Sequence, residues 1–339
     1  ITKYVKTILD PASVRYELEK AFYLATSGRP GPVWLDFPLD VQGEMIDEKK
    51  LPGFSPPTDG NIMKKDELKS KVKKVIEMLQ KAKRPVLIAG FGIRLAGGEK
   101  LLDTLIKHLN IPILLPYNGL DLIPHDHPLL MGKFGPVGNR KGNFVLQNSD
   151  LVLSIGASLS LASIGFNYQG FAPKAKKTMV NIDPGELTKP TLSLDLSICA
   201  DAKDFIEEFL QQTEKTQSFS YPKWLSVCNM WKKRYPQIIP DFFADTKYVN
   251  SYVFFDKLSD LLTKEDIVLT GNSLDAVCLY QALKVKKGQR AFTNANLGGM
   301  GWDLPAAIGA SVAHNRRRTI LVTGDGSIQM NIQELETVK

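Results

Sequence analysis

The sequence is poor in cysteine and histidine, with three cysteines and four histidines among 339 residues. Cys199, Cys228 and Cys278 lie far apart and have neither metal-ligand spacing nor the even number that a disulfide framework needs. We therefore expect buried free thiols and a reducing, cytoplasmic location. His125 and His127 have no third metal ligand or nucleophile nearby in the sequence, so we expect a surface turn there.

Long apolar runs are also absent. No run approaches the roughly eighteen residues that a membrane-spanning helix needs, so no membrane association is expected. Hydrophobic residues make up 43% of the chain and charged residues 23%, which is typical of a globular protein with two or three domains at this length. The formal charge of +7 comes with lysines scattered along helical stretches, so nucleic acid is not an expected partner.

The tightest basic cluster, Arg316–Arg318, comes directly before an apolar stretch. A surface turn that leads into a strand explains this cluster, and assistance to an acidic ligand is the alternative. The sequence leaves both interpretations open.

The first 45 residues have the pattern of a domain's tail. A helical periodicity at Ser13–Ser27 is followed by the turn Gly28–Pro32 and the apolar stretch Val33–Leu35. The start, Ile1–Asp10, has no initiator Met and no signal-peptide layout, so we expect the chain to be part of a longer protein. A Pro- and Gly-rich stretch then predicts a linker over residues 46–62.

Residues 63–212 alternate between helical and strand patterns. Strands separated by helices predict a doubly wound parallel sheet, so an α/β domain is expected. The predicted strands are Pro85–Ala89, Ile111–Leu115, Leu151–Ile155 and Thr178–Ile182, and the predicted helices are Lys64–Ala82, Glu99–Leu109, a short one around Phe144, and Ala202–Gln212. A second linker, residues 213–247, contains a helical segment with two tryptophans.

Residues 248–339 predict another α/β unit. Its expected strands, Ile267–Thr270 and Thr319–Val322, each lead into a loop suited to a ligand. In Gly324–Ser327 a carboxylate stands between two glycines, and a hydroxyl follows. Glycines let backbone amides approach a phosphate, and the carboxylate can hold the divalent ion that bridges it. A common Asp-Gly-Ser turn without a ligand is the structural alternative.

The glycine-rich run Leu297–Ala310, with Gly324–Ser327 after it, resembles the thiamine-diphosphate enzymes and the acetolactate synthase group in particular. The resemblance covers essentially the whole chain, since Gly28–Val41 is similar to the signature that closes the family's pyrimidine-binding domain. It implies the tail of that domain at 1–45, a Rossmann-like central domain at 63–212 and a truncated diphosphate-binding domain at 248–339.

The resemblance also implies a cofactor site. Met300 matches the large apolar residue that holds thiamine in its bent, reactive shape, whereas a flexible core filler is the structural alternative. The loop Thr270–Ser273 matches diphosphate contacts at the start of a helix, although helix capping by Ser273 also explains it. The implied cofactor-binding residues are Thr270, Gly271, Asn272, Ser273, Gly298, Met300, Gly324, Asp325, Gly326 and Ser327, with Asp325 as the Mg²⁺ ligand.

For the complete protein, the resemblance implies decarboxylation of a 2-oxo acid such as pyruvate with thiamine diphosphate and Mg²⁺, followed by addition of the enamine to a carbonyl acceptor. The alternatives are a non-ligating decarboxylase or oxidase of the family, and a non-catalytic binding protein on this scaffold. A homodimer or homotetramer is also implied. The family's activating glutamate has no counterpart here, and Asn331 lies too early for the second metal ligand, so we expect the chain alone to be inactive.

The stretch Gly90–Gly97 follows a predicted strand and invites a dinucleotide-binding interpretation. Its glycine spacing departs from the dinucleotide fingerprint, and no acidic residue stands about twenty residues further on. Ile155–Leu161 lacks the arginine that acetolactate synthases place after the matching glycine. Both observations argue against FAD in the central domain.

Overall fold

The computed structural model describes residues 2–57, 63–214, 219–244, 247–294 and 296–339. The chain divides into two compact units. The first unit comprises Ile1–Met63 with Ile182–Gly185, and the second comprises Lys64–Asn181 with Glu186–Lys339. No helix of the described residues is both long and apolar enough to cross a membrane.

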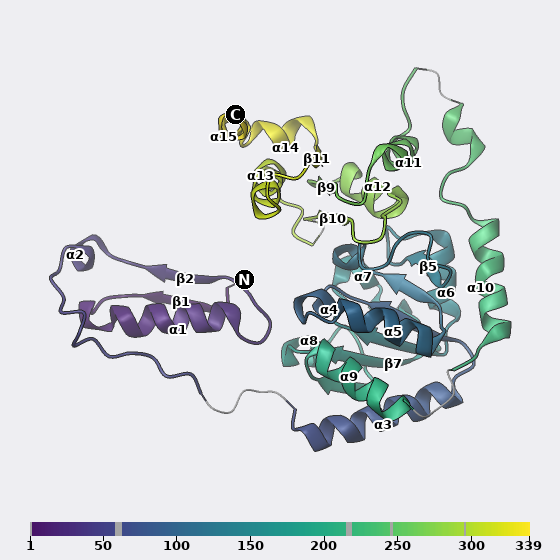
Figure 1. Ribbon diagram of the computed structural model, residues 1–339, viewed down its shortest axis with the longest axis horizontal. Helices are drawn as coiled ribbons and strands as arrows, with labels where there is room; N and C mark the ends of the chain where they lie inside the picture. The colour runs from purple at the N-terminus through teal and green to yellow at the C-terminus, as the bar shows by residue number, and fades with distance from the viewer. Residues whose placement is uncertain (1, 58–62, 215–218, 245–246, 295) are drawn as a thin grey trace. The chain divides into compact units, whose positions relative to one another are not determined.

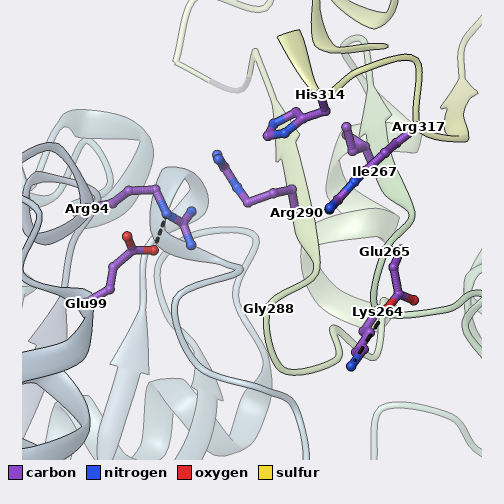
Figure 2. Close-up of a pocket in the computed structure, with 9 residues that line it drawn as sticks. All are labelled: Arg94, Glu99, Lys264, Glu265, Ile267, Gly288, Arg290, His314 and Arg317. Carbon is purple, nitrogen blue, oxygen red and sulfur yellow. Dashed lines mark hydrogen bonds and ion pairs between the residues drawn. The ribbon is translucent and has the colours of Figure 1, made fainter. Parts of the chain in front are cut away.

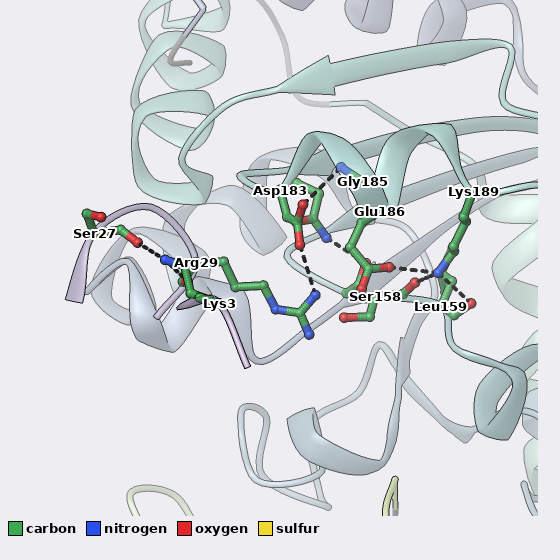
Figure 3. A network of polar contacts seen from close by, with 11 residues as sticks. Lys3, Ser27, Arg29, Ser158, Leu159, Asp183, Gly185, Glu186 and Lys189 are labelled. Carbon is green, nitrogen blue, oxygen red and sulfur yellow. Dashed lines mark hydrogen bonds and ion pairs between the residues drawn. The ribbon is translucent and has the colours of Figure 1, made fainter. Parts of the chain in front are cut away.

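The first unit is a small parallel β-α-β arrangement (Figure 1). Strands β1 (Tyr4–Thr7) and β2 (Val33–Asp36) pair in parallel, and helix α1 (Val14–Thr26) connects them. The ammonium group of Lys3 donates hydrogen bonds to the carbonyl oxygens of Ser27 and Arg29, at 2.7 and 2.9 Å (Figure 3). Lys3 thereby holds the turn that leads from α1 into β2. A short helix, α2 (Leu39–Gln42), follows.

The second unit contains a six-stranded parallel sheet with the strand order β5-β4-β3-β6-β7-β8 (Figure 1). Its three central strands are fully buried, because helices cover both faces of a parallel sheet. The strands are β3 (Pro85–Ala89), β4 (Ile113–Leu115), β5 (Leu130–Lys133), β6 (Leu151–Ile155), β7 (Lys176–Asn181) and β8 (Leu196–Cys199).

Helix α9 (Ala202–Thr213) packs against both α3 (Lys65–Lys81) and α5 (Glu99–Leu109). Helices α6 (Arg140–Asn148) and α10 (Pro222–Arg234) pack together and share a hydrophobic cluster with β3. The remaining short helices are α4 (Gly92–Leu95), α7 (Leu161–Ile164) and α8 (Pro184–Thr188), and 3-10 turns cover Pro11–Ser13, Tyr117–Gly119, Tyr168–Gly170, Pro240–Phe243 and Ile332–Glu334.

The C-terminal part of the second unit has a three-stranded parallel sheet with the order β10-β9-β11. The strands are β9 (Ile267–Thr270), β10 (Arg290–Thr293) and β11 (Thr319–Val322), and the helices are α11 (Ser251–Leu261), α12 (Leu274–Ala282), α13 (Asp303–Ala313), α14 (Asp325–Gln329) and α15 (Leu335–Val338). Helix α13 packs on β9 and β11, whereas α11 and α12 pack together.

Tyr280 of α12 joins the two sheets of the second unit. Its side chain is fully buried and stacks on Tyr117, with the ring centroids 3.9 Å apart. Its hydroxyl donates to the carbonyl oxygens of Leu115 and Phe134, at 2.7 and 3.1 Å. Burial raises the pKa of Tyr280 well above its ordinary value, so the hydroxyl keeps its proton.

The α/β fold class with parallel sheets is confirmed. Four strands carried too little sequence signal to be predicted, and all four lie at the edge of their sheet: β1, β5, β8 and β10. Edge strands are short and tolerate glycine and charge, as Gly132 in β5 and Arg290 in β10 illustrate. The domain boundaries remain a prediction, and 58–62, 215–218 and 245–246 of the two expected linkers lie outside the described residues.

The turn expected at Gly324–Ser327 forms the start of a short helix, α14. Helix α14 begins at Asp325, and Gly324 is the extended residue that precedes it. The amides of Ser327 and Ile328 both donate to the carbonyl oxygen of Gly324, at 3.1 Å each, which closes a helical turn. The carboxylate therefore stands in the first turn of a short helix.

Replacing Gly90 with alanine should lower the free energy of unfolding by at least about 2 kcal/mol. A Cβ at this position would lie 2.3 Å from the carbonyl oxygen of Gly156, which belongs to backbone and cannot give way. Gly309→Ala in α13 is the control, because no atom lies within 4 Å of its Cβ position and alanine favours a helix. Urea unfolding would measure both variants, and equal stability of the two would contradict the packing argument.

Candidate cofactor site

A cavity of about 630 Å³ opens where β9 and β11 end. Parallel strands place their carboxyl ends on the same edge of a sheet, so the loops that follow β9 and β11 meet there. Seven of the ten predicted cofactor-binding residues line it: Asn272, Ser273, Met300, Gly324, Asp325, Gly326 and Ser327. Thr270, Gly271 and Gly298 do not line it.

Ser273 has a strained backbone at the rim of this cavity. Its φ of 62° and ψ of −135° are unusual for a residue with a side chain. Ser273 stands at the N-cap position of α12, but its side chain makes no capping hydrogen bond there, so the interpretation of capping by the Ser273 side chain is wrong. Strain at a non-glycine residue without a capping role is typical of ligand-binding positions.

Asn272 links the two glycine-containing loops of the site. Its side-chain amide donates to the carbonyl oxygen of Gly298 at 3.1 Å. Gly298 itself is exposed, with a φ of 62° that glycine adopts without strain. Gly298 therefore shapes the loop from outside the cavity wall.

Thr270 and Gly271 are buried at the end of β9. The Thr270 hydroxyl has no hydrogen-bond partner among the described residues, an uncommon state for a buried polar group. A Cβ on Gly271 would lie 2.4 Å from a carboxylate oxygen of Asp303, so only glycine fits. The end of β9 is thus packed directly against the first residue of α13.

Three hydrogen bonds tie the Met300 loop to the Asp325 loop. The hydroxyl of Thr323 donates to Asp303, which is fully buried. The amide of Gly301 donates to the hydroxyl of Ser327 at 2.9 Å, and the side chain of Asn331 donates to the carbonyl oxygen of Gly301. The side chains of Asn331 and Ser327 thus both bind the backbone of Gly301 and hold the two loops together.

Met300 is half exposed, which argues against the alternative of a core filler. Its sulfur lies 3.9 Å from the Cβ position of Gly326, so it stands beside the Gly-Asp-Gly segment. An exposed, polarizable apolar side chain in a cavity wall is suited to contact with an apolar face of a ligand.

Gly324 has no structural need to be glycine. Its φ is −78°, which any residue adopts, and no atom lies within 4 Å of its Cβ position. The remaining advantage of glycine there is open access to the backbone, which a phosphate group requires. The arrangement of Gly324 and the exposed Asp325 therefore fits a diphosphate with a hard divalent cation.

Oxygen atoms dominate the polar groups of the cavity. Asp325 accepts only the amide of Gly326, at 2.9 Å, from the described residues, so the carboxylate has oxygen lone pairs left for a cation. No group of three or more His, Cys, Asp or Glu side chains forms a metal cluster within the described ranges. A cation at Asp325 would therefore take its other ligands from phosphate oxygens and water.

Asp275 is a second carboxylate in the cavity wall. Burial raises its pKa, although hydrogen bonds from the amides of Ala276 and Gly271, at 2.8 and 3.3 Å, oppose the shift. The carboxylate of Asp303 contributes a further, smaller increase. The deprotonated form of Asp275 is thus less favourable in the folded chain than in the unfolded chain.

Sequence reasoning missed the rest of the wall. Asp303 lies buried behind the wall and carries no signal of its own, because a carboxylate in the first turn of a helix is common. Thr323 has only the weak signal of standing next to Gly324. The apolar residues on and near α11 carry no sequence signal for a cavity. A helix face that lines a cavity has the same apolar periodicity as one that faces a hydrophobic core. The unpredicted wall consists of Val249, Ser251, Phe254, Phe255, Leu274, Asp275, Val322 and Thr323.

The glycine-rich loop of the central sheet has a packing role. A Cβ on Gly92 would lie 2.8 Å from the backbone of Gly156, so the loops after β3 and β6 touch through their glycines. Lys189 donates to the carbonyl oxygens of Ser158 and Leu159 and to the carboxylate of Glu186 (Figure 3). This part of the sheet edge is filled by the chain's own atoms, and the expectation that FAD is absent stays a prediction.

Comparison with known proteins gives two domain matches. Residues 72–209 match the central domain of thiamine pyrophosphate enzymes, and residues 271–339 match their C-terminal domain that binds thiamine pyrophosphate. The second match contains every residue of the predicted cofactor site except Thr270.

Several acetolactate synthases are similar to the chain. The probable large subunit of Methanocaldococcus jannaschii is 32% identical, over 100% of this chain and 58% of the relative. Acetolactate synthase 1, chloroplastic, of Oryza sativa subsp. japonica is 30% identical over 100% of this chain and 52% of its own length. The acetolactate synthase large subunit of Buchnera aphidicola is 31% identical over 95% of this chain and 56% of its own length. The chain spans about half the length of these relatives.

Thr323→Val should lower the free energy of unfolding by about 2 kcal/mol, because it leaves the buried Asp303 carboxylate without its hydroxyl donor. Thr323→Ser keeps the hydroxyl and is the matched control. Urea unfolding would compare the variants, and equal losses for valine and serine would show that the hydroxyl contributes nothing.

Asp275→Asn should change how stability depends on pH. Since folding raises the pKa of Asp275 above its ordinary value of 3.8, the free energy of unfolding gains a contribution as pH falls through the raised pKa. That gain levels off below the unfolded-state pKa, and it is missing in the asparagine variant. Unfolding of both proteins from neutral pH to about pH 4 would test this, and parallel curves would contradict the raised pKa.

Proposed function

Because this chain belongs to the thiamine pyrophosphate enzymes, we propose that the cavity at Asp325 binds the diphosphate of thiamine diphosphate through Mg²⁺. We further propose that the complete protein acts on a 2-oxo acid of the pyruvate type as an acetolactate-synthase-like decarboxylase and carboligase. The relatives named acetolactate synthase support this activity.

One observation carries the proposal. Asn272, Met300 and Asp325 come from three separate loops, yet they line a single cavity at the carboxyl edge of one sheet. Ligands of parallel α/β sheets bind at this edge. The cavity offers a free carboxylate, open glycine backbone and an exposed apolar side chain, which are the groups that a metal ion, a diphosphate and a ring system need.

Each group has a role in this proposal. Asp325 holds the divalent cation, and the backbone at Gly324 and Gly326 leaves room for phosphate oxygens. Met300 contacts the ring portion of the cofactor and restricts its conformation. The cofactor, when bound, supplies the electron sink for loss of carbon dioxide from a 2-oxo acid and for transfer of the remaining acyl unit.

The apolar wall serves the same chemistry. Phe255 and Val322 belong to the hydrophobic cluster around Tyr280, and both also line the cavity. A wall that continues from a packed core excludes water from the reacting groups, which favours transfer of an acyl unit to a carbonyl acceptor over protonation by solvent. A homodimer or homotetramer and a cytoplasmic location stay predictions.

Asp325→Ala should weaken binding of thiamine diphosphate in the presence of Mg²⁺ by at least about fivefold, because it removes a charge-assisted metal contact. Asp241→Ala removes an exposed carboxylate that does not line the cavity, and it is the control. Isothermal titration calorimetry of the protein would measure both affinities. Equal affinity of the two variants would overturn the assignment of Asp325.

Product analysis of the complete protein with pyruvate as substrate tests the reaction, because the chain alone is expected to be inactive. A carbon–carbon bonded product such as acetolactate is the expected outcome. Acetaldehyde alone would show simple decarboxylation, and acetate formed with an electron acceptor would show oxidation. Either result would contradict the proposed ligation. Cofactor binding without any turnover would leave a binding protein on this scaffold.

A further inference from the structure

A second, smaller cavity of about 350 Å³ lies at the amino ends of β9 and β10 (Figure 2). Its lining includes Ile267 and Arg290, the first residues of these two strands. The candidate cofactor site uses the opposite, carboxyl ends of β9 and β11. The two cavities have no lining residue in common, so any ligand of the smaller one is distinct from the cofactor.

A buried carboxylate positions the cationic walls of this cavity. The side chain of Asp121 is almost fully buried and accepts hydrogen bonds from Arg94 on one oxygen, at 2.5 Å, and from Arg290 on the other, at 2.8 Å. The amide of Ala291 donates to it as well, at 3.1 Å. One buried carboxylate thus fixes the positions of two guanidinium groups.

The guanidinium group of Arg290 is bound through Nε only. Its Nε is bound to Asp121, while its terminal nitrogens donate no hydrogen bond to any described residue. Figure 2 shows the side chain extending between Arg94 and His314. A guanidinium that is already held in place presents its remaining donors to an oxyanion with little further loss of entropy.

Arg317 and Arg318 of the basic cluster Arg316–Arg318 have different environments. Arg318 pairs with Asp266 at 2.5 Å, which lowers the pKa of that carboxyl to about 2 and closes the start of β11 onto β9. Arg317 lines the cavity instead and forms no ion pair with a described residue. Of the two interpretations of this cluster, a turn that leads into a strand explains Arg318. Assistance to an acidic ligand is the interpretation that suits Arg317.

The other charges around the cavity largely cancel. Glu99 is bound to Nε of Arg94 at 2.7 Å. Lys264 forms an ion pair with Glu265, with 3.7 Å between Nζ and Oε1, and both side chains are exposed. Glu99 and Asp121 together balance Arg94 and Arg290, so Arg317 leaves one net positive charge at the cavity. His314 adds an imidazole with N–H donor capacity. A partly enclosed space with a net positive charge attracts anions.

We propose that this cavity binds a small oxyanion of the phosphate class between Arg290 and Arg317. Guanidinium groups match the geometry of phosphate oxygens, with two parallel N–H donors each. The volume lies at the lower end of the range for ligand sites, so it fits one or two phosphate groups better than a whole nucleotide. The source is free phosphate or diphosphate, or the phosphate end of a larger metabolite that projects outward.

Calorimetric titration of the protein with inorganic diphosphate tests the proposal. EDTA is added so that no metal ion can bridge the probe to Asp325, and ionic strength is held constant. Saturable binding is expected, and Arg317→Gln should weaken it about tenfold, as for a lost charged hydrogen bond. Arg316→Gln removes the same charge one residue away, does not line the cavity, and should weaken binding less than about twofold.

Further arms separate the sources and the two cavities. ATP that binds more tightly than diphosphate would support the phosphate end of a larger metabolite, and equal affinities would support a free ion. Asp325→Ala should leave diphosphate binding unchanged, and Arg290→Lys should weaken it as Arg317→Gln does. Non-saturable binding, equal losses in Arg316→Gln and Arg317→Gln, or equally tight binding of adenosine would overturn the proposal.

Discussion

Parallel pairing of β9 with both β10 and β11 is the constraint on which both cavities depend. Parallel strands align their carboxyl ends on one edge and their amino ends on the other. The chain must cross over after each strand, and each crossover brings a loop to each edge. The cavity at the carboxyl edge is lined by glycines, hydroxyls and carboxylates, whereas arginines, a histidine and their partner carboxylates line the cavity at the amino edge.

Buried carboxylates hold this small sheet in register with its surroundings. Asp303 receives the hydroxyl of Thr323 at the carboxyl edge, and Asp266 binds Arg318 at the amino edge. Asp121, from the central part of the chain, binds Arg290 at the start of β10. A buried carboxylate is stable only with its donors in place, so each of these groups favours a single arrangement of the strands.

The sequence predicts the central strands well and the edges poorly. β3 and β6 are buried on both faces and have continuous apolar runs, so their bounds match the sequence pattern. β10 begins with Arg290, whose charge is stabilised by a carboxylate that is far away in the sequence. Local periodicity carries no record of such a partner, and β10 was therefore missed. The same limit hid the role of Arg317, because a basic cluster looks alike whether it faces solvent or a cavity.

The candidate cofactor site shows the same division. Gly324–Ser327 and Met300 stand out as motifs, because glycine spacing around a polar or apolar residue is visible in one segment. Asp275 and the wall from α11 depend on tertiary packing, so no local pattern identifies them as parts of one cavity. The strain at Ser273 is a property of the folded backbone and has no counterpart in residue type.

Tyr280 gives α12 an anchor that reaches beyond its own sheet. The helix starts next to Ser273 at the cavity, and Tyr280 in its last turn is bonded to the carbonyl oxygens of Leu115 in β4 and of Phe134 directly after β5. A helix held in this way cannot shift along its axis without breaking buried hydrogen bonds. The start of α12 therefore presents Leu274 and Asp275 to the cavity in a fixed position, so this wall is a rigid template for whatever binds there.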